Sequence, residues 1–479
     1  MNDHRRSRDD EEDGVASRFQ GLQVLVAGAG VSGRSAAEAL LAAGAAVTVT
    51  DGSADRLAAL ASLQSQGAEL VPGLAEPPVG TDLVVTSPGW RPDAPLLAAS
   101  ATAGVEVIGE VELAWRLDRE KESPATWLAV TGTNGKTTTV SMLESVLRAA
   151  GVDVVACGNV GLPVVDAVRA GHGVLAVELS SFQLHWSESL APRAAVVLNL
   201  AADHLDWHGD LDSYGAAKAK IYAGNAVSVA NADDEWSTRL VGAATGRTVS
   251  FTLGVPQADQ LGVEDGELVD RAFGDRVVLA SLADVHPAGP HNVANALAAA
   301  ALARAYGVQP DAVAEGLRAF QPGAHRSVPV AEADGVSYVD DSKATNPHAA
   351  DAALRAHPRV VWIAGGLLKG AEVDELVAAN ADRLAAAVLI GRDRAQFAAA
   401  LARHAPDVPV REVSAGDDAG MLQAVRLAHE FASPGSVVLL APAAASMDMF
   451  TDYAHRGRAF ADAVREVLTG TPTAPAHGG

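Results

Sequence analysis

The residues with the clearest capacity for chemistry form a short run, Thr131-Gly-Thr-Asn-Gly-Lys-Thr-Thr138. A glycine-rich loop between a strand and a helix presents successive backbone N–H groups, which can surround phosphate oxygens. Lys136 can reach the β- and γ-phosphates, and Thr137 can help to hold Mg²⁺. Valine stands at position 130, where the standard phosphate loop has glycine, so this is a shortened version. The run predicts a nucleotide site formed by Gly132, Thr133, Asn134, Gly135, Lys136, Thr137 and Thr138.

A second glycine run, Gly28-Ala-Gly-Val-Ser-Gly33, follows an apolar strand predicted at 23–27 and precedes a helix predicted to reach Leu41. This spacing permits a tight turn and a close approach of the backbone to a pyrophosphate at the helix N-terminus. Asp51 ends the next predicted strand, where a ribose contact is expected. Taken alone, the pattern indicates an NAD-binding domain, but a UDP-sugar also carries a pyrophosphate and a ribose.

Polar side chains follow two later apolar segments, predicted as strands at 174–177 and 195–198. Glu178 comes directly after the first strand, and Asp203 and His204 follow the second. The carboxyl ends of parallel strands border the crevice in which nucleotides bind, and oxygen-rich loops there suit a hard cation. An isolated glutamate or histidine at such a place is more often structural. Only the motifs around these residues therefore support a role for them in metal binding.

Two predicted helices carry paired polar residues. Lys218 and Lys220 share one helix and would ordinarily form a solvated face. Asn292 and Asn295 stand three residues apart at the start of an Ala-rich helix, which places them on one face. Neither pair specifies a ligand by itself.

The elements that must position these residues repeat one pattern: an apolar strand, a glycine turn and a helix rich in Ala and Leu. This alternation is typical of α/β proteins with parallel sheets. At roughly 100–200 residues per domain, 479 residues predict about three domains. We expect a Rossmann-like N-terminal domain, a central parallel sheet of the phosphate-loop ATPase type and a C-terminal Rossmann-like domain. The expected bounds are a tail at 1–18, domains at 19–122, 123–322 and 323–468, and a tail at 469–479. Further strands are expected at 47–50, 127–130, 360–364, 387–390 and 437–440, and a helix at 138–150.

Composition narrows the class of partner. The net charge is −23 and the pI is about 4.9, so the chain should repel nucleic acid and anionic membranes. The single cysteine, Cys157, cannot form an intrachain disulfide and is expected to be a buried, inert thiol. No apolar run is long enough for a membrane helix, and the charged N-terminus lacks the apolar segment of a secretory signal. We therefore expect a soluble, cytoplasmic monomer that acts on small molecules and has no nucleic-acid or membrane partner.

Together, the motifs resemble those of the Mur ligase family, in the family's order and rough spacing, over residues 22–465. Gly-Thr-Asn-Gly-Lys-Thr is that family's form of the phosphate loop. The resemblance implies ATP and two Mg²⁺ ions as cofactors, with Thr137, Glu178, His204 and Lys218 at the metals. Lys218 matches a lysine that is carbamylated in the family, which would turn a cation into an oxygen ligand. The implied ATP contacts beyond the loop are Asn292 and Asn295 at the adenine, Arg326 at the phosphates, and Asp341.

Two further runs resemble the branch of the family that adds D-glutamate. They are Asp341-Ser-Lys-Ala-Thr-Asn346 and Ala441-Pro-Ala-Ala-Ala-Ser-Met-Asp-Met-Phe450. Leu367 departs from the pattern Gly365-Gly-Leu-Leu-Lys-Gly370, because an aspartate is common at its position. The implied D-glutamate contacts are Lys369, Thr345, Ser446, Met447 and Tyr453. The implied UDP-sugar contacts in the first domain and beyond are Gly30, Val31, Ser32, Asp51, Ser87, Gly89 and Asn159.

The resemblance implies an ATP-dependent ligase that adds D-glutamate to UDP-N-acetylmuramoyl-L-alanine through an acyl phosphate, giving ADP and phosphate. Catalysis would depend on positioning and charge neutralisation by Lys136, Glu178, His204, Lys218 and Lys369. His204 or Asp203 would accept a proton from the attacking amine, and closure would hinge near 322–323.

Three other functions remain open from the sequence. The first is another amide ligase of the superfamily, such as a neighbouring Mur ligase or a folylpolyglutamate synthase, against which the run 341–346 argues. The second is an NAD-dependent oxidoreductase, which leaves the Lys136 loop, Glu178 and His204 unexplained. The third is a non-catalytic nucleotide sensor.

Overall fold

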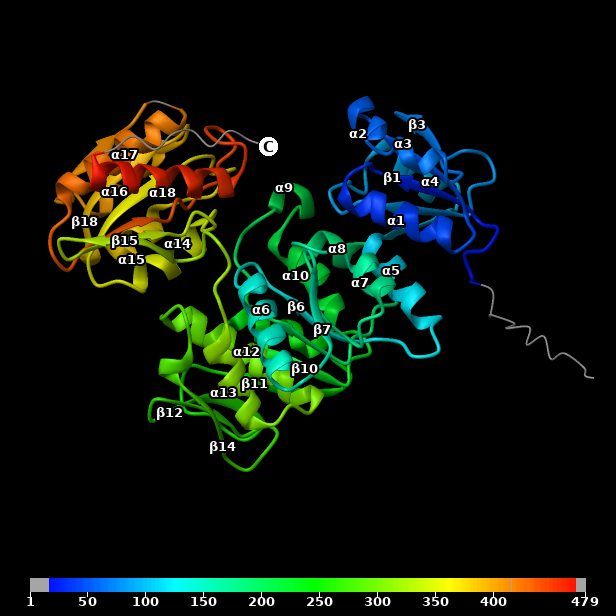
Figure 1. Ribbon diagram of the computed structural model, residues 1–479, viewed down its shortest axis with the longest axis horizontal. Helices are drawn as coiled ribbons and strands as arrows, with labels where there is room; N and C mark the ends of the chain where they lie inside the picture. The colour runs from blue at the N-terminus through cyan, green and yellow to red at the C-terminus, as the bar shows by residue number, and fades with distance from the viewer. Residues whose placement is uncertain (1–16, 415, 471–479) are drawn as a thin grey trace, which may run out of the picture. The chain divides into compact units, whose positions relative to one another are not determined.

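The computed structural model describes residues 17–414 and 416–470 and contains three β-sheets with associated helices (Figure 1). The expected tails at 1–18 and 469–479 lie almost wholly outside the described residues. Contacts divide the chain into two compact units. The first holds Met1–Thr126, Cys157–Leu175 and Phe182–Leu190, and the second holds Trp127–Ala156, Ala176–Ser181 and Ala191–Gly479. The domain boundaries expected near 122 and 322 stay predictions. The α/β class with three sheet-containing regions is confirmed.

The first sheet is parallel throughout, with the strand order β3-β2-β1-β4-β5. Short runs of Val and Leu form its central strands because both faces of a parallel sheet are buried. Strand β1 matches the prediction at 23–27, and α1 ends one residue beyond the predicted Leu41. The strands are β1 (Gln23–Ala27), β2 (Ala46–Asp51), β3 (Glu69–Pro72), β4 (Leu83–Thr86) and β5 (Glu106–Gly109). The helices are α1 (Val31–Ala42), α2 (Ala54–Ala58), α3 (Ala61–Gln64), α4 (Pro95–Thr102) and α5 (Glu110–Arg119).

The second sheet has nine strands in the order β14-β13-β12-β11-β10-β9-β6-β8-β7. Strand β6 lies between β9 and β8 and leads through the phosphate loop into α6. The strands are β6 (Thr126–Thr131), β7 (Val154–Gly158), β8 (Val174–Glu178), β9 (Ala194–Val197), β10 (Val227–Asn231), β11 (Arg247–Phe251), β12 (Gln260–Glu264), β13 (Glu267–Asp270) and β14 (Val277–Ser281). The helices are α6 (Lys136–Ala149), α7 (Val164–Ala170), α8 (Ser181–His185), α9 (Leu205–His208), α10 (Leu211–Ala219), α11 (Glu235–Leu240), α12 (Pro290–Tyr306) and α13 (Pro310–Ala319).

Helix α6 differs from its prediction mainly at its start, and it ends at Ala149, one residue before the expected 150. We expected it to begin at Thr138, but it begins at Lys136, because Gly135 in the left-handed region lets the loop turn directly into the helix. The predicted apolar face is confirmed, since Val140, Leu143, Val146 and Leu147 are all buried. The antiparallel strands β12, β13 and β14 had not been expected from the sequence.

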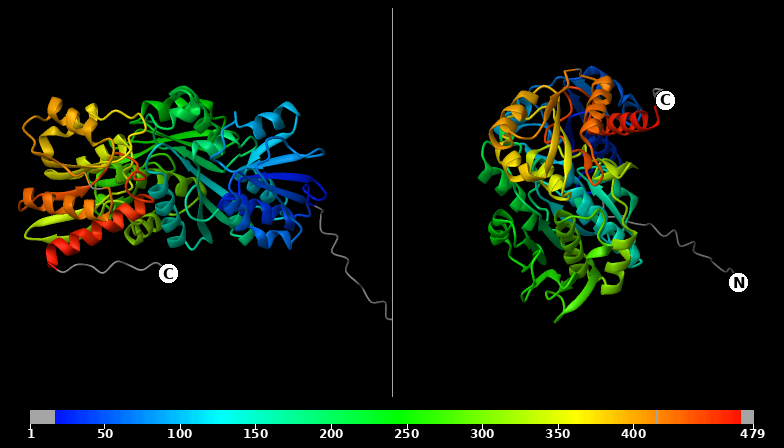
Figure 2. Two further views of the ribbon diagram at one scale, coloured as in Figure 1. Left: turned by 90° about the horizontal axis from the view of Figure 1, so that it is seen from above. Right: turned by 90° about the vertical axis from the view of Figure 1, so that its left-hand side faces the viewer.

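The third sheet has the order β15-β16-β20-β17-β18-β19, with β15 antiparallel and the others parallel. Side chains of β17 alternate between two cores: Trp362 packs with α14, α15 and α16, and Ile363 packs with α17 and α18. Helices therefore cover both faces (Figure 2). The strands are β15 (Val328–Ala333), β16 (Val336–Asp340), β17 (Val360–Gly365), β18 (Leu384–Ile390), β19 (Val410–Glu412) and β20 (Val437–Leu440). The helices are α14 (Pro347–Arg355), α15 (Asp374–Asn380), α16 (Arg394–His404), α17 (Asp418–Phe431) and α18 (Tyr453–Thr469).

Most of the other strands that were expected from the sequence lie at or near their predicted positions. The strands expected at 47–50, 127–130, 174–177, 360–364 and 437–440 are present, and β18 starts three residues before the expected 387. Strand β9 is shifted by one residue from the expected 195–198. Cys157 is 2% exposed, so its predicted burial is confirmed. Across the described part of the chain, no helix combines the length and apolar character that crossing a bilayer requires.

Candidate active site

The phosphate loop between β6 and α6 takes a shape that only glycine permits at two positions. Gly132 has a φ of +153° and Gly135 a φ of +85°. A Cβ at Gly135 would lie 2.4 Å from Oδ1 of Asn295, so the α12 side chain occupies the space beside the loop. Both glycines are therefore required by backbone conformation, and Gly135 also by close packing.

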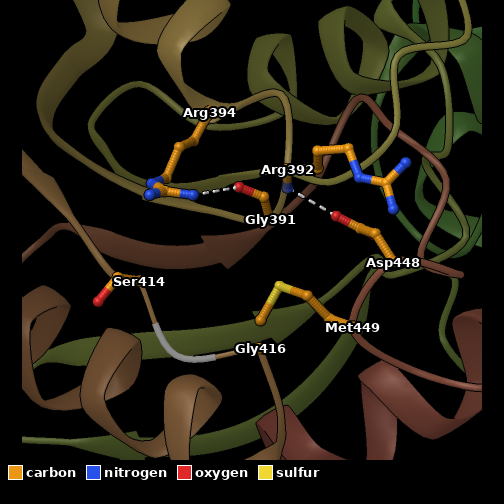
Figure 3. A pocket seen from close by; sticks show the side chains of 7 residues that line it. All are labelled: Gly391, Arg392, Arg394, Ser414, Gly416, Asp448 and Met449. Carbon is orange, nitrogen blue, oxygen red and sulfur yellow. Dashed lines mark hydrogen bonds between the residues drawn. The ribbon is translucent and has the colours of Figure 1, made fainter.

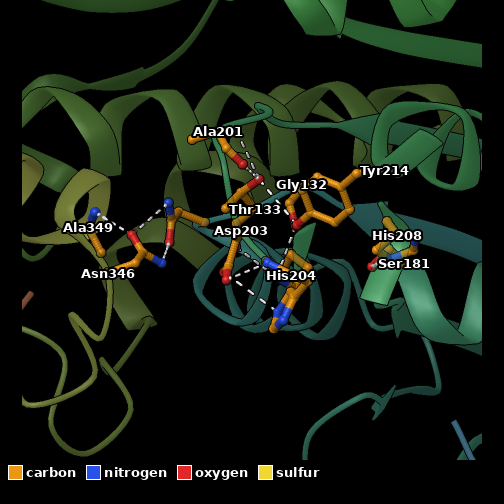
Figure 4. A network of polar contacts seen from close by, with 12 residues as sticks. Gly132, Thr133, Ser181, Ala201, Asp203, His204, His208, Tyr214, Asn346 and Ala349 are labelled. Carbon is orange, nitrogen blue, oxygen red and sulfur yellow. Dashed lines mark hydrogen bonds and ion pairs between the residues drawn. The ribbon is translucent and has the colours of Figure 1, made fainter. Parts of the chain in front are cut away.

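The loop is held in place by residues that follow β9. The backbone N–H of Asn134 donates to Oδ1 of Asn199 (2.9 Å), and Nδ2 of Asn199 donates to the Asn134 carbonyl (3.2 Å). The hydroxyl of Thr133 accepts from the backbone N–H of Ala201 (3.0 Å) and lies 3.3 Å from the hydroxyl of Tyr214. Figure 4 shows the contacts of Thr133 with Ala201 and Tyr214. The sequence analysis gave neither Asn199 nor Tyr214 a role, because their contacts join residues that are distant in the chain.

Two lysines converge on one carbonyl of the loop. Nζ of Lys136 donates to the carbonyls of Gly132 (3.0 Å) and Thr133 (2.9 Å). Nζ of Lys218 donates to the same Gly132 carbonyl (2.9 Å) and lies over the ring of Tyr214. Burial lowers the pKa of both ammonium groups, and the Lys136 charge lowers the pKa of Lys218 further, well below its usual value. Removing both amines from water thus favours their uncharged form, most strongly at Lys218.

The carboxylate expected at the end of β8 lies directly beside the loop. Oε2 of Glu178 accepts a hydrogen bond from the Thr137 hydroxyl (2.6 Å), and Glu178 is buried. A carboxylate and a hydroxyl oxygen at this separation form a donor set that suits a hard cation such as Mg²⁺.

His204 lies at the start of α9, with its φ at +54°. Its backbone N–H donates to Oδ1 of Asp203 (2.9 Å), and its Nε2 lies 3.5 Å from the other carboxylate oxygen (Figure 4). Burial lowers the pKa of the imidazole, Asp203 opposes that shift, and the charges of Lys218 and Lys136 reinforce it. His204 is therefore within electrostatic reach of both lysines at the loop. Within residues 17–414 and 416–470, no group of three or more His, Cys, Asp or Glu residues is arranged for a metal.

The two asparagines of α12 are buried beside α6. Nδ2 of Asn295 donates to Oδ1 of Asn292 (3.4 Å), and the Thr139 hydroxyl donates to Oδ1 of Asn295 (3.2 Å). The expected helix face is therefore present and adjoins the phosphate loop. Its role in adenine recognition stays a prediction.

Charged residues from the third sheet interact with the same region. Burial lowers the pKa of Arg326, while the carboxylates of Glu178 and Asp341 raise it. Burial raises the pKa of Asp341 to about 7. Burial, with Arg326, lowers the pKa of Lys343 to about 8, and its Nζ lies 3.8 Å from the ring centroid of Tyr453. Lys343 lies within the run 341–346, but no contact was predicted for it, because spacing alone does not tell which way its side chain points.

A second link joins the loop to α14. The side-chain amides of Asn134 and Asn346 exchange hydrogen bonds at 3.1 and 3.5 Å, and Nδ1 of His348 lies 3.0 Å from Nδ2 of Asn134. Asn346 also caps α14 by accepting from the Ala349 N–H (2.9 Å). The end of the 341–346 run is thus attached to the phosphate loop.

The predicted D-glutamate contacts occupy loops at the carboxyl ends of the third sheet's strands, except Tyr453, which begins α18. Ser446 is buried, Met447 is 61% exposed, and Thr345 and Tyr453 are partly buried. Lys369 is exposed and has a φ of +52°.

The departure at Leu367 leaves the backbone of this region intact. Leu367 and Ala445 exchange two backbone hydrogen bonds of 2.9 Å, which tie the Lys369 loop to the Ser446 loop. These bonds do not depend on the side chain at 367.

All the predicted UDP-sugar contacts lie in the first compact unit. Gly30, Gly89 and Asn159 are exposed, and Val31 is 71% exposed. Ser32 and Ser87 are partly buried, and the hydroxyl of Ser87 is an inaccessible oxygen without a hydrogen-bond partner. Asp51 is 7% exposed and accepts from the backbone N–H groups of Ala29 and Ser53, both at 2.8 Å.

Comparison with known proteins gives three family models that match along the chain. They are described as Mur ligase MurD-like, N-terminal domain (residues 22–109), Mur ligase middle domain (130–303) and Mur ligase, glutamate ligase domain (325–444).

Individual proteins match over nearly the full length. The UDP-N-acetylmuramoylalanine–D-glutamate ligase of Streptomyces coelicolor is 56% identical over 474 residues, which cover 95% of this chain and 100% of that protein. The ligase of the same name from Thermobifida fusca is 56% identical over 464 residues, covering 93% and 99%. The crystal structure of UDP-N-acetylmuramate-alanine ligase MurC from Thermotoga maritima has a TM-score of 0.57 at 21% identity, covering 94% of this chain and 100% of that one. The structural match bears on the fold alone.

Proposed function

We propose a function from one premise: the chain belongs to the Mur ligase family. It is an ATP-dependent ligase that joins D-glutamate to UDP-N-acetylmuramoyl-L-alanine, releasing ADP and phosphate. The observation that carries this proposal is the 56% identity, over the whole length of the relative, to a protein named for that reaction. The runs at 341–346 and 441–450, which resemble the D-glutamate-adding branch, support the same substrate.

The reaction joins two steps that share one site. The substrate carboxylate attacks the γ-phosphate of ATP, and the amine of D-glutamate then displaces phosphate from the acyl phosphate. The first step brings two anions together, so the protein's main task is positioning and charge neutralisation. Lys136, Arg326 and Lys343 supply that charge locally in a chain whose net charge is −23.

Mg²⁺ fits this site through the oxygens of Thr137 and Glu178, with His204 as the proposed ligand of a second ion. When bound, the ions would offset negative charge on the phosphates. In the structure as it stands, Lys136 donates to the carbonyls of its own loop. ATP would draw this side chain onto the phosphates.

Lys218 is proposed to be carbamylated. Its amine is 1% exposed and its pKa is well below the usual value, chiefly because of burial, so the uncharged amine that attacks CO₂ is favoured. The amine nitrogen forms a bond to the carbon of CO₂ and releases one proton, leaving a carbamate. An NMR spectrum of protein supplied with ¹³C-bicarbonate should show a carbamate carbon that disappears in Lys218→Ala.

The proposed function is tested by ADP release from purified protein with ATP, Mg²⁺ and UDP-N-acetylmuramoyl-L-alanine. Parallel reactions receive D-glutamate, L-glutamate or meso-diaminopimelate. Release with D-glutamate alone is the expected result. Release with another amino acid would retain the ligase and reject the substrate, and no release with any would reject the proposal.

A further inference from the structure

Arg456 is a buried cation in α18 whose hydrogen-bond partners are neutral. Only 1% of the Arg456 surface is exposed to solvent. Burial lowers the pKa of its guanidinium, and Asp448 and Asp340 are the carboxylates that oppose this shift. A buried charge is costly unless its hydrogen bonds are made, and an apolar residue of similar volume often serves stability as well or better. Stability alone therefore gives little reason for an arginine at this place.

The guanidinium joins two loops that are far apart in the sequence. Nε donates to the Ser342 hydroxyl (3.0 Å), and Nη2 donates to the Ser342 carbonyl (2.8 Å). Nη1 donates to the carbonyl of Ala444 (3.0 Å). The Ser342 hydroxyl in turn donates to the Tyr453 carbonyl (2.8 Å), at the start of the helix that carries Arg456. Four hydrogen bonds thus fix three segments to one another.

Each of these segments carries a predicted D-glutamate contact. Thr345 follows Ser342 in the first loop, Ser446 follows Ala444 in the second, and Tyr453 begins α18. The guanidinium has no surface exposed to a substrate, because it is enclosed by the segments that it joins. It can set the spacing of the contacts without being one of them.

A second anchor holds the far side of the Ser446 loop. Oδ2 of Asp448 accepts the backbone N–H of Arg392 (2.7 Å), as Figure 3 shows. Gly391 makes this approach possible, since its φ is +78° and a Cβ there would lie 2.8 Å from that oxygen. The two residues between the anchors at Ala444 and Asp448 that were assigned to D-glutamate, Ser446 and Met447, are therefore held from both directions.

We infer that Arg456 is a positioning residue for the incoming amino acid: it fixes the distance between the Thr345 loop and the Ser446 loop. The inference rests on the proposed function, because it takes D-glutamate as the ligand of these loops. The phosphate loop belongs to another sheet and makes none of these bonds. Loss of the guanidinium should therefore weaken amino-acid binding more than binding of ATP.

The test measures KM for each of the three substrates in Arg456→Lys and Arg456→Met. Arg456→Met should raise KM for D-glutamate at least about tenfold, equivalent to about 1.4 kcal/mol, with KM for the UDP substrate changed by less than about twofold. Arg456→Lys keeps the charge but loses the planar set of donors, so it should recover only part of the affinity.

Controls separate positioning from stability. Phe460→Leu trims a fully buried side chain of the same helix that packs in the core of the sheet, so it should lower Tm and leave KM for D-glutamate unchanged. If Arg456→Met does not fold, Ser342→Ala removes only the hydroxyl between Nε and Tyr453 and should raise the same KM about threefold. Equal changes in all three KM values, or a change in Tm alone, would overturn the inference. If wild-type protein uses a different amino acid, the proposed substrate fails, and the same comparison of KM values is made with that amino acid.

Discussion

The loops after β1 and β6 share a strand–turn–helix geometry but differ in which side chains surround them. After β1, Asp51 from the neighbouring strand accepts a loop N–H and forms an ion pair of 3.9 Å with the exposed Arg56. After β6, the partly buried Lys136 and the buried Lys218 donate to a loop carbonyl, and the buried Glu178 accepts from Thr137. The backbone turn is thus common to both, whereas the residues at the ends of adjacent strands decide the chemistry. The loop after β6 thus carries charged side chains around it, whereas ligand binding by the loop after β1 stays a prediction.

The largest expected effect comes from removing Lys136, the lysine beside the loop after β6. Lys136→Ala should lower kcat/KM for ATP by about 10²–10³-fold or more, because it removes the cation that is proposed to move onto the phosphates when ATP binds. ADP release and Tm would both be measured for the variant, so that loss of activity can be told from loss of the fold. Turnover near the wild-type rate in a folded variant would contradict the role of Lys136.

The two loops can also be compared by how much space each leaves for a side chain at its glycines. A Cβ at Gly33 would lie 1.8 Å from the Gly28 carbonyl oxygen, and one at Gly135 would meet Asn295 in a backbone region that disfavours side chains. Each alanine variant should lose about 1–3 kcal/mol of unfolding free energy. Gly30→Ala is the matched control, since a Cβ there meets nothing within 4 Å and should cost less than about 1 kcal/mol. Denaturant unfolding of the three variants checks this order, and an equal loss in all three would refute the steric account.

Asp51→Asn tests whether the first loop works independently of the second. An asparagine can accept one of the two N–H groups but not both, so about 1–3 kcal/mol of unfolding free energy should be lost. KM for the UDP substrate should rise while KM for ATP stays constant. A parallel rise in both values would show that the loops are coupled.

The smallest effect concerns pH and Lys343. Its pKa in the folded state is about 8, below the ordinary value of 10.5, so the unfolded chain binds more protons between these two values. Unfolding free energy therefore rises with pH across that interval, as the buried ammonium loses its charge. The difference in stability between wild type and Lys343→Met should shift in favour of wild type from pH 8 to 10. Chemical denaturation at several pH values measures it, and a pH-independent difference would argue against the shifted pKa.

The sequence predicted what depends on local pattern. Both glycine loops, Glu178 at the end of β8, and eight of the twenty described strands follow from apolar runs and glycine positions that neighbours along the chain determine, whereas the other strands were not predicted. The start of α6 at Lys136 was missed because it depends on the left-handed Gly135. Tyr214, Lys343 and Arg456 acquire their contacts only when distant segments meet, so no spacing rule could place them.

The position of Lys136 in this structure has a consequence for selectivity. Its ammonium already makes hydrogen bonds to the Gly132 and Thr133 carbonyls, and Lys218 donates to the first of these. Before a nucleotide can bind the Lys136 ammonium, these two charge-assisted hydrogen bonds must break. Only a ligand that places phosphate charge beside the ammonium compensates for the free energy of the broken bonds. By the same argument, adenosine or AMP would leave Lys136 bound to the loop carbonyls, whereas a triphosphate would draw it away from them.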